Sequence, residues 1–201
     1  MRKAINHLTK SDPVLAAIIQ RVGPYRIQFR EPEFGTLVRS IVYQQLSGKV
    51  ASVILERLIA ALPGRKLTPR AILKLTPEKM RSLGLSGAKT AYIRDLAART
   101  KAGEVVFEDI HARTDEEVIE HLTQVKGIGV WTAHMFLIFA LQRPNVLPVG
   151  DLGVRAAIKR AYGLEELPKP KEVERIAAGW HPYCSVAAWY LWRSLDGPAE
   201  L

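Results

Sequence analysis

Several features that often reveal a protein's class are scarce or missing in this chain. Among 201 residues there is one cysteine, Cys184, which excludes an internal disulfide, a four-cysteine iron–sulfur cluster and a zinc ribbon. No apolar run reaches the roughly 18 residues that a membrane-spanning helix needs, and no apolar signal segment follows Met1-Arg2-Lys3. Strand patterns are nearly absent, since Val105-Val106-Phe107 is the one plausible extended piece. We therefore expect an all-α, soluble, intracellular protein.

Acidic residues are also in short supply. Twenty Asp and Glu stand against 29 Lys and Arg, which gives a formal charge of +9 and a pI near 9.8. The basic residues are spread along the chain instead of forming a tail. This balance favours a polyanionic partner such as nucleic acid. The alternative is a basic protein whose charged faces are simply solvated.

Helix signals cover most of the chain. Apolar periodicity extends from Phe34 to about Leu62, and Gly48 suggests a joint between two helices within it. Polar caps followed by proline, or by Glu at the third position, mark four further helix starts. These are Ser11-Asp12-Pro13, Thr68-Pro69, Thr76-Pro77 and Thr114-Asp115-Glu116-Glu117.

The most informative stretch is a glycine turn, Lys126-Gly127-Ile128-Gly129, between two helical patterns. Residues 130–142 are apolar nearly all round, which predicts a buried helix. Glycines let a phosphate approach the main chain, and the first amides of the next helix point outward with positive potential. Lys126 adds charge at the rim, and Ile128 can anchor the turn. An ordinary αα-hairpin is the alternative, but the flanking patterns favour a DNA-binding helix-hairpin-helix over residues 115–142.

A second glycine turn loosely repeats the first. Residues 83–91 (Leu83-Gly84-Leu85-Ser86-Gly87-Ala88-Lys89-Thr90-Ala91) echo the pattern around Gly127 and Gly129. Two turn-then-helix units could contact the same ligand, although coincidence among glycine turns explains the echo equally well.

A single carboxylate follows the hairpin. Asp151 lies in Pro148-Val149-Gly150-Asp151-Leu152-Gly153, directly before another helical pattern. Aspartate at this place usually caps a helix N-terminus. A capping carboxylate is also a fixed, oriented negative charge, which suits the stabilisation of a cationic transition state. Both roles are compatible.

Tryptophans offer a second possible contribution to chemistry. Trp131 directly follows the hairpin, and Trp189 and Trp192 lie in the last helical pattern. Core packing explains each of them equally well. An aromatic wall would hold a flipped, positively charged base by stacking and cation–π attraction.

Taken together, these motifs resemble a known family. Residues 122–133 with residues 148–153 look like the helix-hairpin-helix/Gly-Pro-Asp (HhH-GPD) superfamily of DNA glycosylases, in its 3-methyladenine DNA glycosylase II (AlkA/MAG-like) branch. Residues 37–48, 143–148 and 180–192 agree with it, and the resemblance covers roughly residues 7–195.

The resemblance implies a single HhH-GPD glycosylase unit over residues 1–201, all-helical and two-lobed, with the active-site cleft between the lobes. One lobe is expected over residues 36–145 and the other over residues 1–35 plus 152–201. We expect the chain to be without the N-terminal β domain that longer members carry.

Site residues follow from the same resemblance. Asp151 is expected to be catalytic, with Trp131, Trp192, Tyr43 and Met135 around the base. A wedge loop, Tyr43-Gln44-Gln45-Leu46-Ser47, would fill the gap left by the extruded nucleotide, with Gln45 as the plug and Leu46 second. The expected DNA-binding residues are Lys126, Gly127, Ile128, Gly129, Gln45, Leu46 and Ser47. No cofactor is expected to be required, although the carbonyls of Thr123, Val125 and Ile128 could hold a structural Na⁺ or K⁺.

Two positions depart from the wider family pattern. Glycosylases with lyase activity have a lysine where this chain has Trp131, so a Schiff base with the sugar is not expected. Cys184 stands where an arginine is expected after Pro182-Tyr183, which removes one candidate phosphate or base contact.

The implied activity is that of a monofunctional glycosylase in base excision repair. It would flip 3-methyladenine or 7-methylguanine out of duplex DNA and hydrolyse the N-glycosidic bond to leave an abasic site. Such cationic bases leave without a general acid, which fits one carboxylate. One alternative is a non-catalytic helix-hairpin-helix DNA-binding module, although pure binding has no need of Asp151. Another is a glycosylase for hypoxanthine, N1-methyladenine or N3-methylcytosine.

The expected partner is double-stranded DNA containing alkylated bases, bound by a monomer without membrane contact. The expected location is the cytoplasm with the nucleoid in a prokaryote, or the nucleus in a eukaryote.

Overall fold

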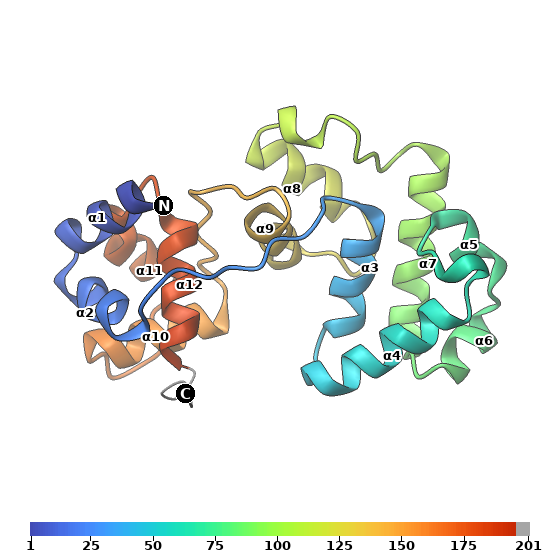
Figure 1. The fold of residues 1–201 in the computed structure, drawn as a ribbon, viewed down its shortest axis with the longest axis horizontal. Coiled ribbons are helices and arrows are strands. Elements are labelled where there is room, and N and C mark those ends of the chain that lie inside the picture. The colour runs from blue at the N-terminus through green and yellow to red at the C-terminus, as the bar shows by residue number, and fades with distance from the viewer. Residues whose placement is uncertain (196–201) are drawn as a thin grey trace. The chain divides into compact units, whose positions relative to one another are not determined.

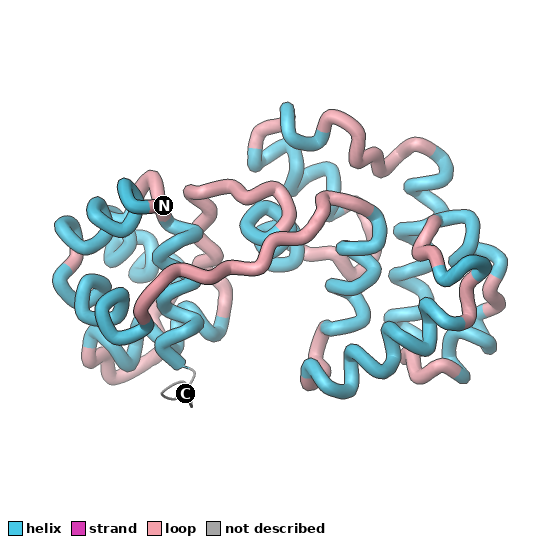
Figure 2. Tube along the Cα trace, viewed as in Figure 1, coloured by secondary structure: helices cyan, strands magenta, loops and turns pink. Residues whose placement is uncertain are grey.

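The computed structural model describes residues 1–195, and every regular element within that range is a helix (Figures 1 and 2). The all-α prediction is therefore confirmed. No helix in the described range is long and apolar enough to cross a membrane. Val105-Val106-Phe107, expected to be extended, pairs with no strand. His121 Nε2 lies 3.1 Å from both the N and the O of Val106 and bonds one of them according to its tautomer.

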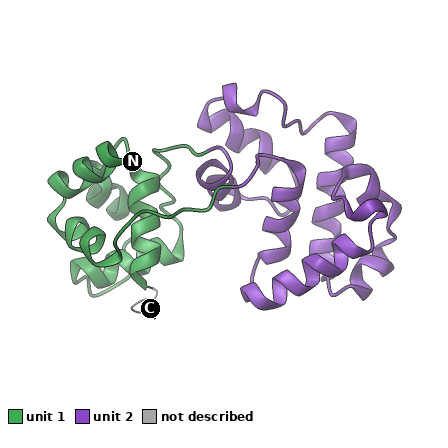
Figure 3. Ribbon diagram, in the orientation of Figure 1, with its two compact units in different colours: residues 1–29, 142–201 green, residues 30–141 purple. Residues whose placement is uncertain are grey.

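The chain divides into two compact units, coloured separately in Figure 3. Unit 1 comprises Met1–Phe29 with Gln142–Leu201, and unit 2 comprises Arg30–Leu141. The lobes expected from the sequence were residues 1–35 plus 152–201 and residues 36–145. In the structure the segment before Asp151 belongs with unit 1, together with the carboxylate itself.

Unit 2 is built around one central helix. This helix, α7 (Gly87–Ala102), packs against both α3 and α5, and its buried residues Ile93 and Leu96 contribute to the core. The other helices are α3 (Phe34–Tyr43), α4 (Gly48–Ala60), α5 (Pro69–Lys74), α6 (Pro77–Ser82), α8 (Asp115–Thr123) and α9 (Val130–Phe139), with two short 3₁₀ turns, Pro63–Arg65 and Ile110–Ala112.

The sequence-predicted caps start these helices. Thr68 and Thr76 cap α5 and α6, each with proline in the first turn. Thr114 and Glu117 form both bonds of a capping box at α8, with Thr114 N–H to Glu117 Oε2 at 2.7 Å. Ser47 caps α4 directly before Gly48, which confirms the predicted joint between α3 and α4.

Unit 1 is a second helical bundle. Its last helix, α12 (Cys184–Leu195), is buried along most of its length and packs against α2 and α10. The remaining elements are α1 (Arg2–Ser11), α2 (Pro13–Val22), α10 (Leu152–Tyr162), α11 (Pro170–Ile176) and a 3₁₀ turn at Ala177–Trp180.

A buried aspartate ties three of these elements together. Asp12 caps α2 by accepting the Leu15 N–H at 2.9 Å. Its other carboxylate oxygen accepts Trp180 Nε1–H at 2.8 Å and the Tyr162 hydroxyl. A buried charge is tolerated where it is fully hydrogen-bonded. Because Tyr162 ends α10, this network fixes the helix that begins after Asp151.

Candidate functional site

The hairpin of unit 2 joins α8 to α9 through a tight turn. Ile128 N–H donates to Val125 O at 3.1 Å, and both side chains are buried, so the turn is anchored in the core. Lys126 is exposed at the rim, as expected, while its own N–H donates to Asp95 Oδ2 at 2.9 Å. The first intrahelical bond of α9 runs from Ala133 N–H to Gly129 O, so the preceding amides lie at the positive end of the helix.

The two glycines of the turn serve different purposes. Gly127 has φ +80°, and a Cβ there would lie 2.1 Å from Cδ2 of Tyr92. Gly129 has φ −95°, and a Cβ there would meet nothing within 4 Å. Gly127 is therefore needed for the fold of the turn. Gly129 leaves open space in front of the α9 N-terminus, where an anion can approach.

The carbonyls expected to hold a monovalent cation surround this turn. That of Val125 accepts the Ile128 N–H at 3.1 Å. A carbonyl oxygen has a second lone pair, so the arrangement is compatible with a cation on Thr123, Val125 and Ile128. Within residues 1–195, no group of three or more His, Cys, Asp or Glu is placed to bind a metal ion. The monovalent cation stays a prediction.

The predicted wedge loop lies beside the hairpin within unit 2. Gln44 Nε2 donates to Gly127 O at 2.9 Å. Gln45 is exposed with φ +55°, a left-handed conformation that non-glycine residues adopt rarely. Leu46 is 38% exposed, so both candidate plugs face solvent. Ser47 instead caps α4, which limits it to positioning the loop or to a single further hydrogen bond.

Three expected base-contacting residues also belong to unit 2. Trp131 and Met135 are one helical turn apart on α9 and so share a face. Trp131 is 48% exposed, so the expectation of an all-round buried helix is wrong for the first turn of α9. Tyr43 ends α3, half-buried, with the Arg39 guanidinium 4.1 Å from its ring centroid. That guanidinium already occupies part of the ring surface offered for base stacking.

The carboxylate predicted to be catalytic lies in unit 1. Asp151 is the N-cap of α10, and its Oδ1 accepts the Val154 N–H at 2.7 Å. The same oxygen accepts Trp192 Nε1–H at 2.7 Å. The side chain is 7% exposed. The charge is therefore fixed in direction by two donors, one local and one from α12.

Trp192 was expected to be an aromatic wall, and the structure gives it a hydrogen-bonding contact as well. A Cβ on Gly153 would lie 2.9 Å from Cδ1 of Trp192, so the indole packs directly on the α10 backbone. The sequence contained no local signal for this contact, because 41 residues separate Trp192 from Asp151.

A serine that sequence reasoning did not single out holds the loop before Asp151. Ser185 Oγ donates to Arg143 O at 2.6 Å and accepts the Val146 N–H at 3.0 Å. Ser185 N–H also donates to Pro144 O at 3.0 Å. The start of α12 thus fixes the approach to the carboxylate.

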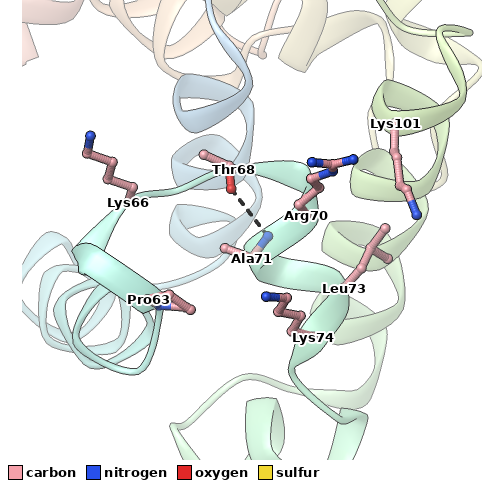
Figure 4. Close-up of a pocket in the computed structure, with 8 residues that line it drawn as sticks. All are labelled: Pro63, Lys66, Thr68, Arg70, Ala71, Leu73, Lys74 and Lys101. Atoms are coloured by element: carbon pink, nitrogen blue, oxygen red, sulfur yellow. Dashed lines mark hydrogen bonds between the residues drawn. The ribbon is translucent and has the colours of Figure 1, made fainter.

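A separate basic hollow of about 560 Å³ lies in unit 2 (Figure 4). Its lining includes four cationic side chains and no carboxylate: Lys66, Arg70, Lys74 and Lys101. On α7, Lys101 follows Tyr92 by nine residues, which places the two on opposite sides of the helix, about 180° apart. The hollow is therefore not part of the hairpin surface.

Comparisons with known proteins agree with these features. The family model described as "HhH-GPD superfamily base excision DNA repair protein" matches residues 38–182. A protein named DNA-3-methyladenine glycosylase 1 from Schizosaccharomyces pombe is 34% identical over 200 residues, covering 96% of this chain and 87% of its own length.

Two solved structures are similar along nearly the whole chain. One is the S. pombe 3-methyladenine DNA glycosylase Mag1 in complex with abasic DNA, with a TM-score of 0.85 and 34% identity over 94% of this chain and 95% of that one. The other is a DNA-3-methyladenine glycosidase from Bacillus halodurans, with a TM-score of 0.85 and 35% identity over 96% of this chain and 89% of that one.

Proposed function

Because this chain belongs to the HhH-GPD superfamily of base excision DNA repair proteins, we propose that it is a monofunctional DNA glycosylase acting on alkylated bases. The observation that carries this proposal is Asp151, a buried carboxylate held by Val154 and Trp192 at the start of α10. The names of the relatives, DNA-3-methyladenine glycosylase and glycosidase, support 3-methyladenine and 7-methylguanine as the substrate class.

DNA binding is assigned to the hairpin of unit 2. The open space at Gly129, the positive end of α9 and the exposed Lys126 together suit one phosphate of the backbone. Mag1, a protein of the same fold, was solved in complex with abasic DNA, which supports DNA as the partner.

Base extrusion is assigned to the wedge loop. Flipping a nucleotide costs a few kcal/mol, and a side chain that enters the vacated space offsets part of this cost. Both candidates are exposed, but Gln45 has the more constrained backbone, so it remains the first candidate plug, with Leu46 second. Trp131 would stack on the extruded base, and its attraction is greatest for a cationic ring.

The chemical step then needs one carboxylate. The bond between C1′ and the base nitrogen breaks with both electrons going to the base, so an alkylated cationic base leaves neutral. Asp151 stabilises the oxocarbenium-like sugar that forms, and water adds to C1′ and loses a proton. Trp131 has no amine, so no Schiff base with the sugar can form at that position and the abasic strand stays intact.

A non-catalytic DNA-binding module is the alternative from another class. The hairpin alone fits it equally well. The carboxylate discriminates, because a binding module gains nothing from a buried, doubly hydrogen-bonded Asp151 beyond a helix cap.

The decisive experiment is single-turnover base release from duplex DNA treated with a methylating agent, with the released bases identified by chromatography. Asp151→Asn keeps the capping oxygen and removes the charge. We expect a loss of about 10²–10³-fold or more in the release rate, with DNA affinity and thermal stability retained. Asp109→Asn, an exposed position at φ +57°, is the matched control. Near-normal release by Asp151→Asn would reject the catalytic assignment.

A further inference from the structure

A lysine on α7 holds the wedge loop from the protein side. Lys89 Nζ donates to Val42 O at 2.8 Å and to Gln44 O at 2.6 Å. These carbonyls stand at the C-terminal end of α3, where the last carbonyls lack intrahelical partners and carry the negative end of the helix dipole. The ammonium therefore bridges the end of the helix and the loop that follows it.

The Lys89 side chain is turned into unit 2 and not toward solvent. It is half-buried, and burial lowers the pKa of its ammonium. Two of its three donors are used by main-chain carbonyls. The turn at residues 83–91 therefore does not present this lysine as a phosphate contact, as a second DNA-contacting turn would.

The same helix also holds the hairpin. One turn after Lys89, the Tyr92 ring packs against Gly127, where a Cβ would come within 2.1 Å of Cδ2. One turn further, Asp95 Oδ2 accepts the Lys126 N–H at 2.9 Å. Three successive turns of one rigid helix thus contact the two segments expected to meet DNA.

The wedge loop and the hairpin also contact each other directly. Gln44 carries the carbonyl bonded by Lys89, and its side-chain amide donates to Gly127 O at 2.9 Å. Gln45, which directly follows this doubly held residue, has φ +55°. A non-glycine residue persists in this conformation only where its surroundings hold it.

We propose that Lys89 is a positioning residue for base extrusion, which rests on the function proposed above for the wedge loop. Lys89 fixes the position and orientation of Gln45 relative to the hairpin turn that is proposed to bind phosphate. It contacts neither DNA nor the reacting atoms. Gln44 is its partner in this role.

The test uses Lys89→Met, which keeps the side-chain length and removes the donors. Lys101→Met is the matched control, because it makes the same change on the same helix at an exposed position about 120° around the helix axis from Lys89. Duplexes carry 7-methylguanine either opposite cytosine or opposite an abasic analogue, with 2-aminopurine next to the lesion to report unstacking. Release rates, fluorescence and affinity are measured for each.

We expect Lys89→Met to lose about tenfold or more in release rate opposite cytosine but less than about threefold opposite the abasic analogue, where extrusion costs less. With cytosine opposite the lesion, the increase in 2-aminopurine fluorescence should be reduced along with the release rate. The affinity for DNA should stay within about twofold of wild type. Gln44→Ala should give the same pattern, which keeps the test valid if Lys89→Met folds poorly.

Equal losses on both duplexes, or an unchanged fluorescence rise, would overturn the positioning role. A wild-type protein that unstacks the duplex but releases no base would reject the glycosylase function alone, and the fluorescence comparison would still decide the role of Lys89. A wild-type protein that never unstacks the duplex would reject both.

Discussion

One oxygen atom of the Asp151 carboxylate accepts two hydrogen bonds. Oδ1 accepts both the capping amide of Val154 and the indole N–H of Trp192, each at 2.7 Å. The cap fixes the side chain to the first turn of α10, and the indole fixes its direction from α12. Capping is therefore compatible with the catalytic role proposed for Asp151, because both need the carboxylate held in one direction.

This arrangement predicts a measurable role for the indole nitrogen of Trp192. Trp192→Phe removes the donor but keeps an aromatic ring against Gly153. A hydrogen bond to a charged acceptor contributes about 1.5–3 kcal/mol, so we expect roughly a tenfold or larger fall in the single-turnover release rate. Trp189→Phe, on the same helix but packed on Tyr25, is the control. An unaffected rate in Trp192→Phe would show that the bond does not position Asp151.

Cys184 is a core residue and not a contact for DNA or base. Its side chain is fully buried in unit 1, with Sγ 3.5 Å from His181 Nδ1. Burial raises the pKa of the thiol from 9.0 to about 12. The departure from the expected arginine is thus accommodated by packing at the start of α12.

We expect the native Cys184 thiol to resist alkylation at pH 8 and to react fully once the chain is unfolded. The raised pKa also makes stability depend on pH. The contribution of this thiol to the free energy of unfolding is complete below about pH 9. It is lost as pH rises toward about 12, because the thiol ionises first in the unfolded chain. Mass spectrometry after iodoacetamide treatment, with and without denaturant, measures the protection. Rapid native labelling would contradict the burial.

At the scale of elements, the hairpin shows that two glycines in one motif are not equivalent. Gly127 combines a positive φ with the Tyr92 ring against its Cα. Gly129 has an ordinary φ and open space. The fold of the turn depends on the first glycine, whereas the second leaves open space for the proposed approach of a phosphate.

We therefore expect Gly127→Ala and Gly129→Ala to impair different properties, protein stability in the first case and DNA binding in the second. The first should destabilise the protein by about 1–2 kcal/mol from its φ alone, with a further cost from the contact with Tyr92. The second should leave the melting temperature nearly unchanged and weaken DNA binding, because a methyl group occupies the phosphate approach. Thermal denaturation and a binding titration separate the two. Equal effects of both variants on stability would contradict this division.

The elements that sequence reasoning identified best are those with local polar signals. The capping box at Thr114 and the proline starts after Thr68 and Thr76 each involve contacts within three residues. The first helix, α1, was not predicted. Its N-cap makes no side-chain bond, and Ala4 and Leu8 are its only buried residues, so its stability comes from packing in unit 1.

At the scale of the whole molecule, the basic residues that give the net charge of +9 are spread along the chain. Lys126 lies at the hairpin, whereas the four cations of the basic hollow line a different site, in which Lys101 lies on the side of α7 opposite Tyr92. Only charges that meet DNA phosphates release counterions on binding.

We therefore expect Lys126→Ala to reduce the slope of log K against log salt concentration by about 1, uniformly across DNA sequences. Lys101→Ala should change this slope less when a short duplex is the ligand. Binding isotherms at several salt concentrations measure both. A larger effect at Lys101 than at Lys126 would move the DNA-binding surface away from the hairpin.

The sequence by itself determined the helices other than α1, the polar caps, the glycine turn and the carboxylate before α10, because each depends on residues within a few positions of one another. Only the tertiary structure decided which groups hold these features in place. Trp192 reaches Asp151 across 41 residues, Lys89 reaches Val42 across 47, and Gln44 reaches Gly127 across 83. Such contacts follow from how helices pack, and a donor far along the chain leaves no periodic or local signal that marks its acceptor.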